Sequence, residues 1–215
     1  MNDLVQSKIH SLIVSSGNPD GKGANGFLLD WYRTEPRGVV VKPERQVLAE
    51  YFTSMLILSA SFKYKPAVGT ENFLYVIDGE WSLSLIPPDQ WSSARQAGFV
   101  GTCVLQHDMT WTIDPSDNLA VDGPVADAVA LFYDAFAGSL DTDLTLEEIL
   151  PFYVGRMPYY QRLYANALSR SIRGTVTLTG KRDLKSRDWQ LALPRRSEKL
   201  LASAQDDAGK QSHRG

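Results

Sequence analysis

Residues 73–86 read FLYVIDGEWSLSLI, two runs rich in aromatic and branched residues on either side of Asp78-Gly79. Asp-Gly supplies the positive φ angles of the tight turn between two antiparallel strands, and aromatic and branched residues favour strands. The stretch therefore predicts a β-hairpin with strands at residues 73–77 and 80–86. Pro87-Pro88 ends the second strand, because proline has no backbone N–H to donate to a sheet.

The neighbouring residues predict further strands. Residues 99–105 and 109–113 are largely apolar, and residues 60–65 alternate between apolar and polar side chains as a half-buried edge strand does. A sheet of this size needs helices to cover its apolar face. We therefore expect an α+β fold: a single antiparallel sheet of four to five strands, arranged as a meander and packed by N-terminal and C-terminal helices.

Helices are predicted both before and after the strands in the sequence. Apolar residues recur at helical spacing in residues 4–13 and again after Pro43. Later helices begin at Pro124 and Pro158, and Gly138 and Gly174 are placed to end them. Between them, Thr145 and Glu148 have the spacing of a capping box. Residues 15–26 are predicted to form a glycine-rich loop, residues 27–32 a helical turn or two, and residues 175–179 a further strand.

Length and composition predict one domain. The chain has 215 residues, of which 43% are hydrophobic and 22% charged, as in ordinary globular proteins. We expect a single domain over residues 1–194 and a largely disordered basic and polar tail over 195–215. No apolar run is long enough to cross a membrane, residues 1–14 do not resemble a signal peptide, and Cys103 is the only cysteine. A cytoplasmic protein is expected.

Charge is segregated along the chain, although the net charge is only −3. Residues 96–155 contain ten acidic residues and no Lys or Arg, whereas residues 156–215 contain thirteen basic and five acidic residues. The two segments are complementary, so they either pair within one chain or associate with a protein partner or a second copy. The alternative, a nucleic-acid-binding arm, fits poorly with an isoelectric point near 5.6.

Motifs for catalysis or cofactor binding are weak. The glycine-rich stretch at residues 17–23 lacks the spacing of a phosphate-binding loop, and three histidines with one cysteine form no metal-binding pattern. Cys103 and His107 lie on one face of a predicted strand, but about 13 Å apart at 3.3 Å per residue, too far for His107 to activate the thiol. We expect no cofactor and no metal, and a structural role for Cys103.

The candidate binding surface is a polar turn bordered by aromatic residues. It comprises the turn Gln106-His107-Asp108 together with Trp91 and Trp111, because aromatic rings near polar loop groups can hold ligands. The competing interpretation places these rings in the core. Tyr75, a further aromatic residue of the sheet, and Arg162, a candidate anion holder, complete the set of candidate site residues.

Three classes of function remain open from the residues alone. The favoured prediction is a non-catalytic binding or protein-interaction module that presents the polar and aromatic turn. The alternative is a small-molecule enzyme that uses His107 and Asp108, with Tyr75 or Arg162 holding an anion in a concave pocket. A third is a binder of single-stranded nucleic acid that uses aromatic stacking and the basic residues 181–199.

Three stretches resemble one family: residues 73–75, 79–91 and 99–111, which read FLY, GEWSLSLIPPDQW and FVGTCVLQHDMTW. They resemble the uncharacterised family catalogued as domain of unknown function 2452, found in bacteria and eukaryotes. The likeness is strongest over residues 40–113, and residues 18–23, 150–153 and 159–162 are similar to its bacterial branch. The resemblance implies no reaction, ligand or cofactor. Eukaryotic members look shorter and lack the C-terminal helices, so a role for Arg162 would not extend to them.

Overall fold

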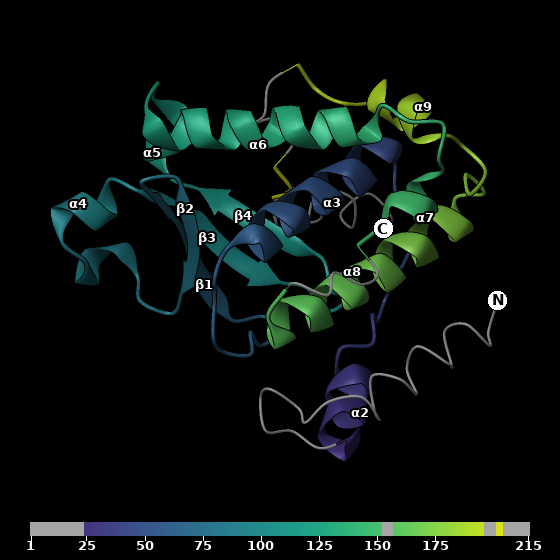
Figure 1. The fold of residues 1–215 in the computed structure, drawn as a ribbon, viewed down its shortest axis with the longest axis horizontal. Helices are drawn as coiled ribbons and strands as arrows, with labels where there is room; N and C mark the ends of the chain where they lie inside the picture. Colours follow the sequence, from purple (N-terminus) through teal and green to yellow (C-terminus); the bar gives the residue numbers. More distant parts are fainter. Residues whose placement is uncertain (1–23, 152–156, 196–200, 204–215) are drawn as a thin grey trace, which may run out of the picture.

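The computed structural model describes residues 24–151, 157–195 and 201–203. Four strands, β1 (Glu71–Ile77), β2 (Glu80–Ser84), β3 (Phe99–Leu105) and β4 (Trp111–Pro115), form one antiparallel sheet in the order β2-β1-β3-β4. Helices pack against this sheet and extend beyond one end of it (Figure 1). The predicted α+β fold with a single antiparallel sheet of four to five strands is confirmed.

The hairpin predicted around Asp78-Gly79 joins β1 to β2. Ile77 pairs with Glu80, and both turn residues have positive φ angles, 52° at Asp78 and 79° at Gly79. These are the angles that the turn between two twisted strands requires, which is why aspartate and glycine stand there. The prediction of the hairpin is confirmed.

The strand order differs from that of the predicted meander, because β3 pairs with β1 and not with β2. Residues 85–98 carry the chain away from the edge strand β2 through two short helices, η1 (Pro88–Gln90) and α4 (Ser93–Gln96). They return it on the far side of β1, where the Val76 amide donates to the Gly98 carbonyl at 2.8 Å. This connection places β1 between β2 and β3 in the sheet.

The edge strand predicted at residues 60–65 is absent from the described sheet. Only Ser61 makes a bridge, to Ser82 of β2. Phe62 is buried in the core, and the Tyr64 hydroxyl donates a 2.6 Å hydrogen bond to Asn72 Oδ1. The predicted alternation is present, since Ala60 and Phe62 are buried and Ser61 and Lys63 exposed, but the segment does not pair as a regular strand.

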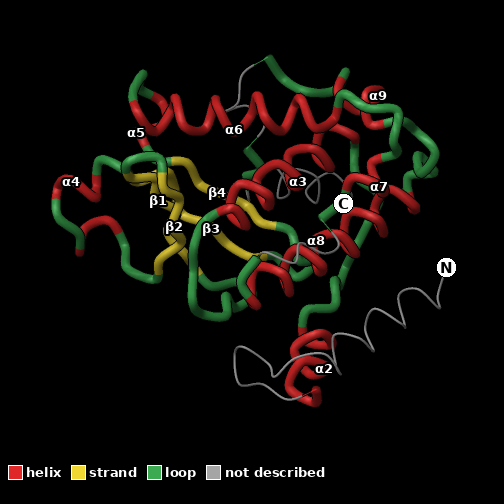
Figure 2. Tube along the Cα trace, viewed as in Figure 1, coloured by secondary structure: helices red, strands yellow, loops and turns green. Residues whose placement is uncertain are grey.

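Helix α3 (Glu44–Ser59) is the central helix, and it begins directly after Pro43 as predicted. Its side chains are buried on nearly all sides, including Leu48, Phe52 and Leu56, each fully inaccessible to solvent. It packs on β4, where the Trp111 amide donates to Ser54 Oγ at 2.9 Å. In Figures 1 and 2, α3 lies between α6 (Pro124–Leu140) and α8 (Tyr159–Leu178).

Two helices run past the glycines that were predicted to end them. Helix α6 extends to Leu140 and α8 to Leu178, so the strand predicted at residues 175–179 is wrong. Thr175 and Val176 are almost fully buried within α8, and this packing outweighs the preference of β-branched residues for strands. The capping box of Thr145 and Glu148 is confirmed at the start of α7 (Leu146–Ile149).

The remaining elements frame the core. Helix α2 (Ala24–Arg33) includes residues 24–26, which were predicted as loop, and α5 (Asp117–Ala120) precedes α6. Helix α9 (Ser186–Gln190) buries Trp189 beside α6. The predicted helix at residues 4–13 lies outside the described residues.

Residues 201–203 fall in the predicted disordered tail, yet they pack on the core. The Ala202 amide donates to Thr53 Oγ1 at 2.8 Å, its carbonyl accepts from the Ile113 amide at 2.8 Å, and Leu201 is buried. Residues 196–200 and 204–215 lie outside the described residues. Three residues of the segment predicted to be largely disordered are therefore ordered against the core.

Candidate functional site

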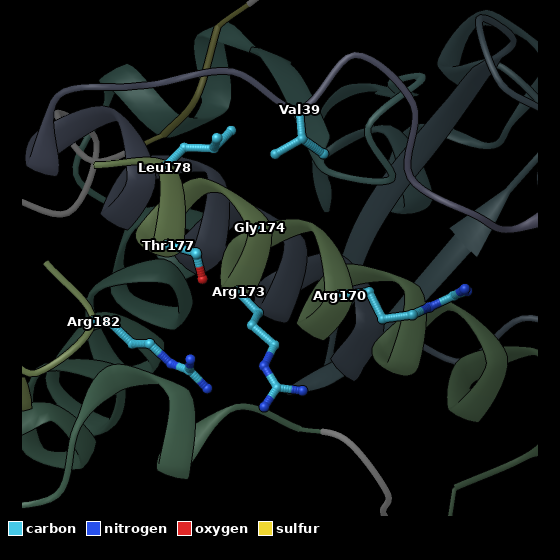
Figure 3. A pocket seen from close by; sticks show the side chains of 7 residues that line it. All are labelled: Val39, Arg170, Arg173, Gly174, Thr177, Leu178 and Arg182. Atoms are coloured by element: carbon cyan, nitrogen blue, oxygen red, sulfur yellow. The ribbon is translucent and has the colours of Figure 1, made fainter. Parts of the chain in front are cut away.

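A shallow groove, wide open to solvent, runs along one face of α8. Its volume is about 590 Å³, and its lining residues are Val39, Arg170, Arg173, Gly174, Thr177, Leu178 and Arg182. Five of them recur at three- and four-residue spacing on α8, which places them on a single face. Figure 3 shows this arrangement, with Val39 approaching α8 from the segment before α3. We call this surface the arginine groove.

One wall of the arginine groove is basic. The side chains of Arg173 and Arg182 are 42% and 53% exposed, and both pair with Glu147 of α7. Arg182 Nε donates to Glu147 Oε2 at 2.8 Å, and its Nη2 donates to Oε1 at 3.3 Å. These hydrogen bonds lower the pKa of Glu147, so this carboxylate stays ionised near neutral pH. One carboxylate thus orients two guanidinium groups along the groove.

The third guanidinium, Arg170, is anchored more deeply. Its Nη2 donates to the Thr34 carbonyl at 2.9 Å, and its guanidinium carbon lies 4.4 Å from the centre of the Trp31 ring. Burial lowers the pKa of Arg170, and the nearby Glu35 carboxylate opposes that shift. An arginine keeps its charge at neutral pH in such a site. Arg170 therefore contributes a fixed positive charge at one end of the groove.

The opposite wall is apolar. Val39 lies directly over Gly174, where an added Cβ atom would come within 3.1 Å of the Val39 side chain. A larger residue at position 174 would require the Val39 side chain to shift by a few tenths of an ångström. Leu178, at the end of α8, is 54% exposed and continues the apolar surface. The groove thus places an aliphatic wall beside the paired guanidinium groups of Arg173 and Arg182, with the Arg170 group pointing away from them towards Trp31 and Thr34 (Figure 3).

Sequence reasoning missed this groove because it ended the helix at Gly174. With residues 175–179 taken as a strand, Thr177 and Leu178 would not share a face with Arg170 and Arg173. The signal in the sequence was the spacing itself, since residues 170, 173, 174, 177 and 178 follow the i, i+3, i+4, i+7, i+8 pattern of one helix face.

The predicted turn Gln106-His107-Asp108 joins β3 to β4. The Gln106 amide and carbonyl bond to Thr110 and Met109 across the turn, and Gln106 Nε2 donates to Thr112 Oγ1 at 2.7 Å. His107 is exposed, whereas Asp108 is only 8% exposed. The structure therefore brings these three residues together, but it turns the Asp108 side chain inwards.

Asp108 belongs to a buried charge cluster with Lys42 and Glu50. Lys42 Nζ lies 2.7 Å from both carboxylate oxygens of Glu50 and 2.7 Å from Asp108 Oδ2. Gln46 donates to Glu50 at 3.1 Å, and the amide and hydroxyl of Thr110 donate to Asp108 Oδ1 at 3.1 and 2.7 Å. One ammonium group thus joins the segment before α3, α3 itself and the β3–β4 turn.

The buried cluster shifts the pKa values of its members. Burial raises the pKa of Glu50 to about 7, against the opposing effect of Lys42. Burial alone lowers the pKa of Lys42, but Glu50 and Asp108 outweigh it and leave that pKa above its ordinary value. Two carboxyl groups therefore share one cation where solvent hardly reaches, and this burial raises the pH at which Glu50 ionises. The contacts are those of a structural cluster that positions the turn.

The aromatic members of the predicted surface lie apart from the turn. Trp111 is 1% exposed and pairs with Leu105 at the end of β3 that carries the turn. Trp91 packs at the other end of β3, its ring centre 6.5 Å from that of Tyr75, and the Arg95 guanidinium lies 4.0 Å above its ring. Six residues of extended strand separate the two ends by about 20 Å. The structure does not assemble one aromatic surface.

Tyr75 and Arg162 also lie away from the turn. Tyr75 is 2% exposed, and its hydroxyl donates to the Ile86 carbonyl at 2.9 Å. Arg162 lies in the first turn of α8, outside the arginine groove. A second hollow of about 580 Å³, between η1, α4 and α5, is not lined by Tyr75, His107, Asp108 or Arg162 either. The pocket expected for an enzyme is not formed by these four residues in either cavity.

Cys103 is fully buried in the core, and its burial raises the pKa of the thiol. A thiol in such surroundings is inert, because the thiolate is the reactive form. His107 lies in the turn beyond the end of β3 and is exposed. The structural role predicted for Cys103 agrees with this position.

The complementary charged segments meet within the chain. Lys185 and Arg187 pair with Asp143 at 2.9 and 3.4 Å, and Arg173 and Arg182 pair with Glu147. All four basic residues come from residues 156–215, and both acidic residues from residues 96–155. Part of the segregated charge is therefore neutralised inside one molecule.

Comparisons with known proteins leave the site to be judged from its geometry. Within the described ranges, no group of three or more His, Cys, Asp and Glu side chains could hold a metal ion, and no helix is long and apolar enough to cross a membrane. No protein-family model, curated protein or solved structure matches the chain. The resemblance to domain of unknown function 2452 stays a prediction.

Proposed function

We propose that the protein is a binding module whose arginine groove holds an acidic, partly aliphatic segment of a protein. The observation that carries the proposal is the pairing of an aliphatic wall, Val39 and Leu178, with two arginines on one face of α8, Arg170 and Arg173, and a third just beyond the end of the helix, Arg182. Guanidinium groups donate charge-assisted hydrogen bonds to carboxylates, and exposed aliphatic side chains gain from burial. A segment with both kinds of side chain satisfies both walls.

The groove suits a protein segment better than a nucleic acid. Glu147, which holds Arg173 and Arg182 in place, would repel a run of phosphates. The lining also offers no aromatic ring on which a base could stack. A peptide with spaced carboxylates can reach the outer N–H groups of the same arginines without losing the Glu147 pairs, because a guanidinium group has five donors.

The test is fluorescence anisotropy with a labelled helical peptide of glutamate, alanine and leucine. Arg182→Gln should weaken binding about tenfold, the equivalent of about 1.4 kcal/mol. The change leaves Glu147 paired with Arg173, so the fold should survive. Leu178→Ala should weaken binding through the apolar wall. The matched control is Lys185→Gln, because Lys185 is also half-exposed and paired with an acidic residue, but lies outside the groove.

Two results would overturn the proposal. One is equal loss of affinity in Arg182→Gln and Lys185→Gln, which would mean that the overall positive charge of this surface, and not the groove, attracts the peptide. The other is tighter binding of a single-stranded deoxythymidine oligonucleotide than of the peptide, with a steep loss of affinity as salt rises. That result would favour the nucleic-acid-binding alternative.

A further inference from the structure

Helix α6 exposes a face that matches the arginine groove in chemistry. Its inner side is buried through Val125, Val129, Phe136 and Leu140. On its outer side Asp127, Leu131 and Asp134 are exposed, and Leu131 is 73% exposed. These three residues follow the i, i+4, i+7 spacing of one helix face. We call this surface the α6 face.

The two surfaces also match in length and sign. Asp127 to Asp134 span about 10 Å of helix, and Arg170 to Leu178 span about 12 Å, at 1.5 Å per residue. The α6 face presents an aliphatic side chain between two carboxylates, and α6 contains no basic residue. The groove presents an aliphatic wall beside three guanidinium groups, two of which Glu147 holds in place while their other donors face outwards. The α6 face supplies carboxylates, the groove supplies guanidinium groups, and both supply aliphatic side chains.

The α6 face cannot reach the groove of its own chain. In Figures 1 and 2, α3 lies between α6 and α8, and α3 packs against both helices. The three side chains of the α6 face are also exposed, so within the described part of the chain this face is open to another molecule. A second copy of the chain carries the same complementary pair of surfaces.

Building on the proposed function, we propose that the partner in the arginine groove is the α6 face of a second copy of this chain. Leu131 packs against Leu178 and Val39, and Asp127 and Asp134 accept hydrogen bonds from the groove arginines. The contact joins two different surfaces, so each copy offers one α6 face and one groove. An interface of a single helix face is small and belongs to the weak, concentration-dependent class.

The test uses two charge-reversed variants of the full chain. The α6 variant carries Leu131→Lys and Asp134→Lys, and the groove variant carries Leu178→Glu and Arg182→Glu. All four positions are exposed, so circular dichroism and thermal unfolding should show folded proteins. When two copies of the α6 variant meet, a basic α6 face faces a basic groove. When two copies of the groove variant meet, an acidic α6 face faces an acidic groove. Each should therefore self-associate at least tenfold more weakly than the wild type in sedimentation velocity.

Mixing the two variants gives the decisive measurement. The acidic α6 face of the groove variant fits the intact groove of the α6 variant, so an equimolar mixture should regain the association that each variant lacks. The matched control is Asp122→Lys, which reverses an exposed charge just before α6 but off the α6 face, and should associate as the wild type does.

The possible failures are distinguishable. If the labelled peptide binds the groove while the wild-type chain stays monomeric at all concentrations, the second copy is not the partner, and the proposed function stands. If the wild type associates but both variants associate equally well, another surface carries the contact, and this inference is overturned. If neither the peptide nor a second copy binds, both proposals fail.

Discussion

The Lys42 ammonium lies 2.7 Å from Asp108 Oδ2, although 66 residues separate the two along the chain. Lys42 also holds Glu50 of α3 at 2.7 Å. Through this one side chain, the segment that lines the arginine groove with Val39 is tied to the central helix and to the β3–β4 turn. The backbone adds a second tie, since the Arg37 amide donates to the His107 carbonyl at 2.9 Å.

Replacing Lys42 should destabilise the fold strongly. Lys42→Met leaves two carboxylates buried without their cation, a change that typically costs about 3–5 kcal/mol. The free energy of unfolding in urea measures the loss. Lys63→Met is the matched control, because Lys63 is exposed and a surface change of this kind shifts stability by no more than about 0.5 kcal/mol. Similar losses in both variants would contradict a structural role for the cluster.

Stability should fall as pH rises from about 4.5 to 7 and level off above neutrality. The pKa of Glu50 is raised from 4.5 to about 7 in the folded chain, so between these values the folded chain binds a proton that the unfolded chain releases. The contribution is complete below the unfolded pKa and is lost above the folded pKa, with a slope of at most about 1.4 kcal/mol per pH unit.

Glu50→Gln should remove this slope, because its side chain cannot titrate. Urea unfolding of the variant and the wild type between about pH 5 and 8 makes the comparison. Asp143 and Glu147 do not interfere there, because their pKa values are lowered and their stabilisation is lost only at more acidic pH. Equal slopes in both proteins would assign the pH dependence to other groups.

Cys103 should be protected from thiol reagents in the native protein. It is fully buried, and burial raises the pKa of its thiol, so reaction with a disulfide reagent requires opening of the core. We expect labelling at least about a hundredfold slower in buffer than in denaturing urea. Immediate stoichiometric labelling of the native chain would instead reveal an accessible, reactive thiol.

Two glycines should respond in opposite ways to alanine. At Gly101 an added Cβ atom would lie 2.5 Å from the Asp114 carbonyl oxygen, so Gly101→Ala should force β3 from β4 at a cost of about 1–3 kcal/mol. Gly138 is exposed within α6, with no atom near an added Cβ. Gly138→Ala should therefore stabilise the chain by about 0.5–1 kcal/mol. Thermal unfolding of both variants checks the pair, and equal effects would contradict the close packing at Gly101.

Local sequence determined the elements whose signals are short in range. The β1–β2 hairpin follows from Asp78-Gly79, because a turn with two positive φ angles admits few other residues. Helix α3 follows from its apolar spacing behind Pro43, and α7 from its capping box. Each of these signals is carried by residues of a single element, so no residue distant in the sequence is needed to interpret it.

Tertiary structure alone decided the strand order, the length of α8 and the positions of the candidate site residues. Nothing local specifies that β3 passes β2 to pair with β1. Burial of Thr175 and Val176 carries α8 past Gly174, and only this extension completes the arginine groove. Lys42 meets Asp108, and Trp111 enters the core, because long-range packing removes them from water. Propensity and spacing are properties of neighbouring residues, whereas burial depends on the whole fold.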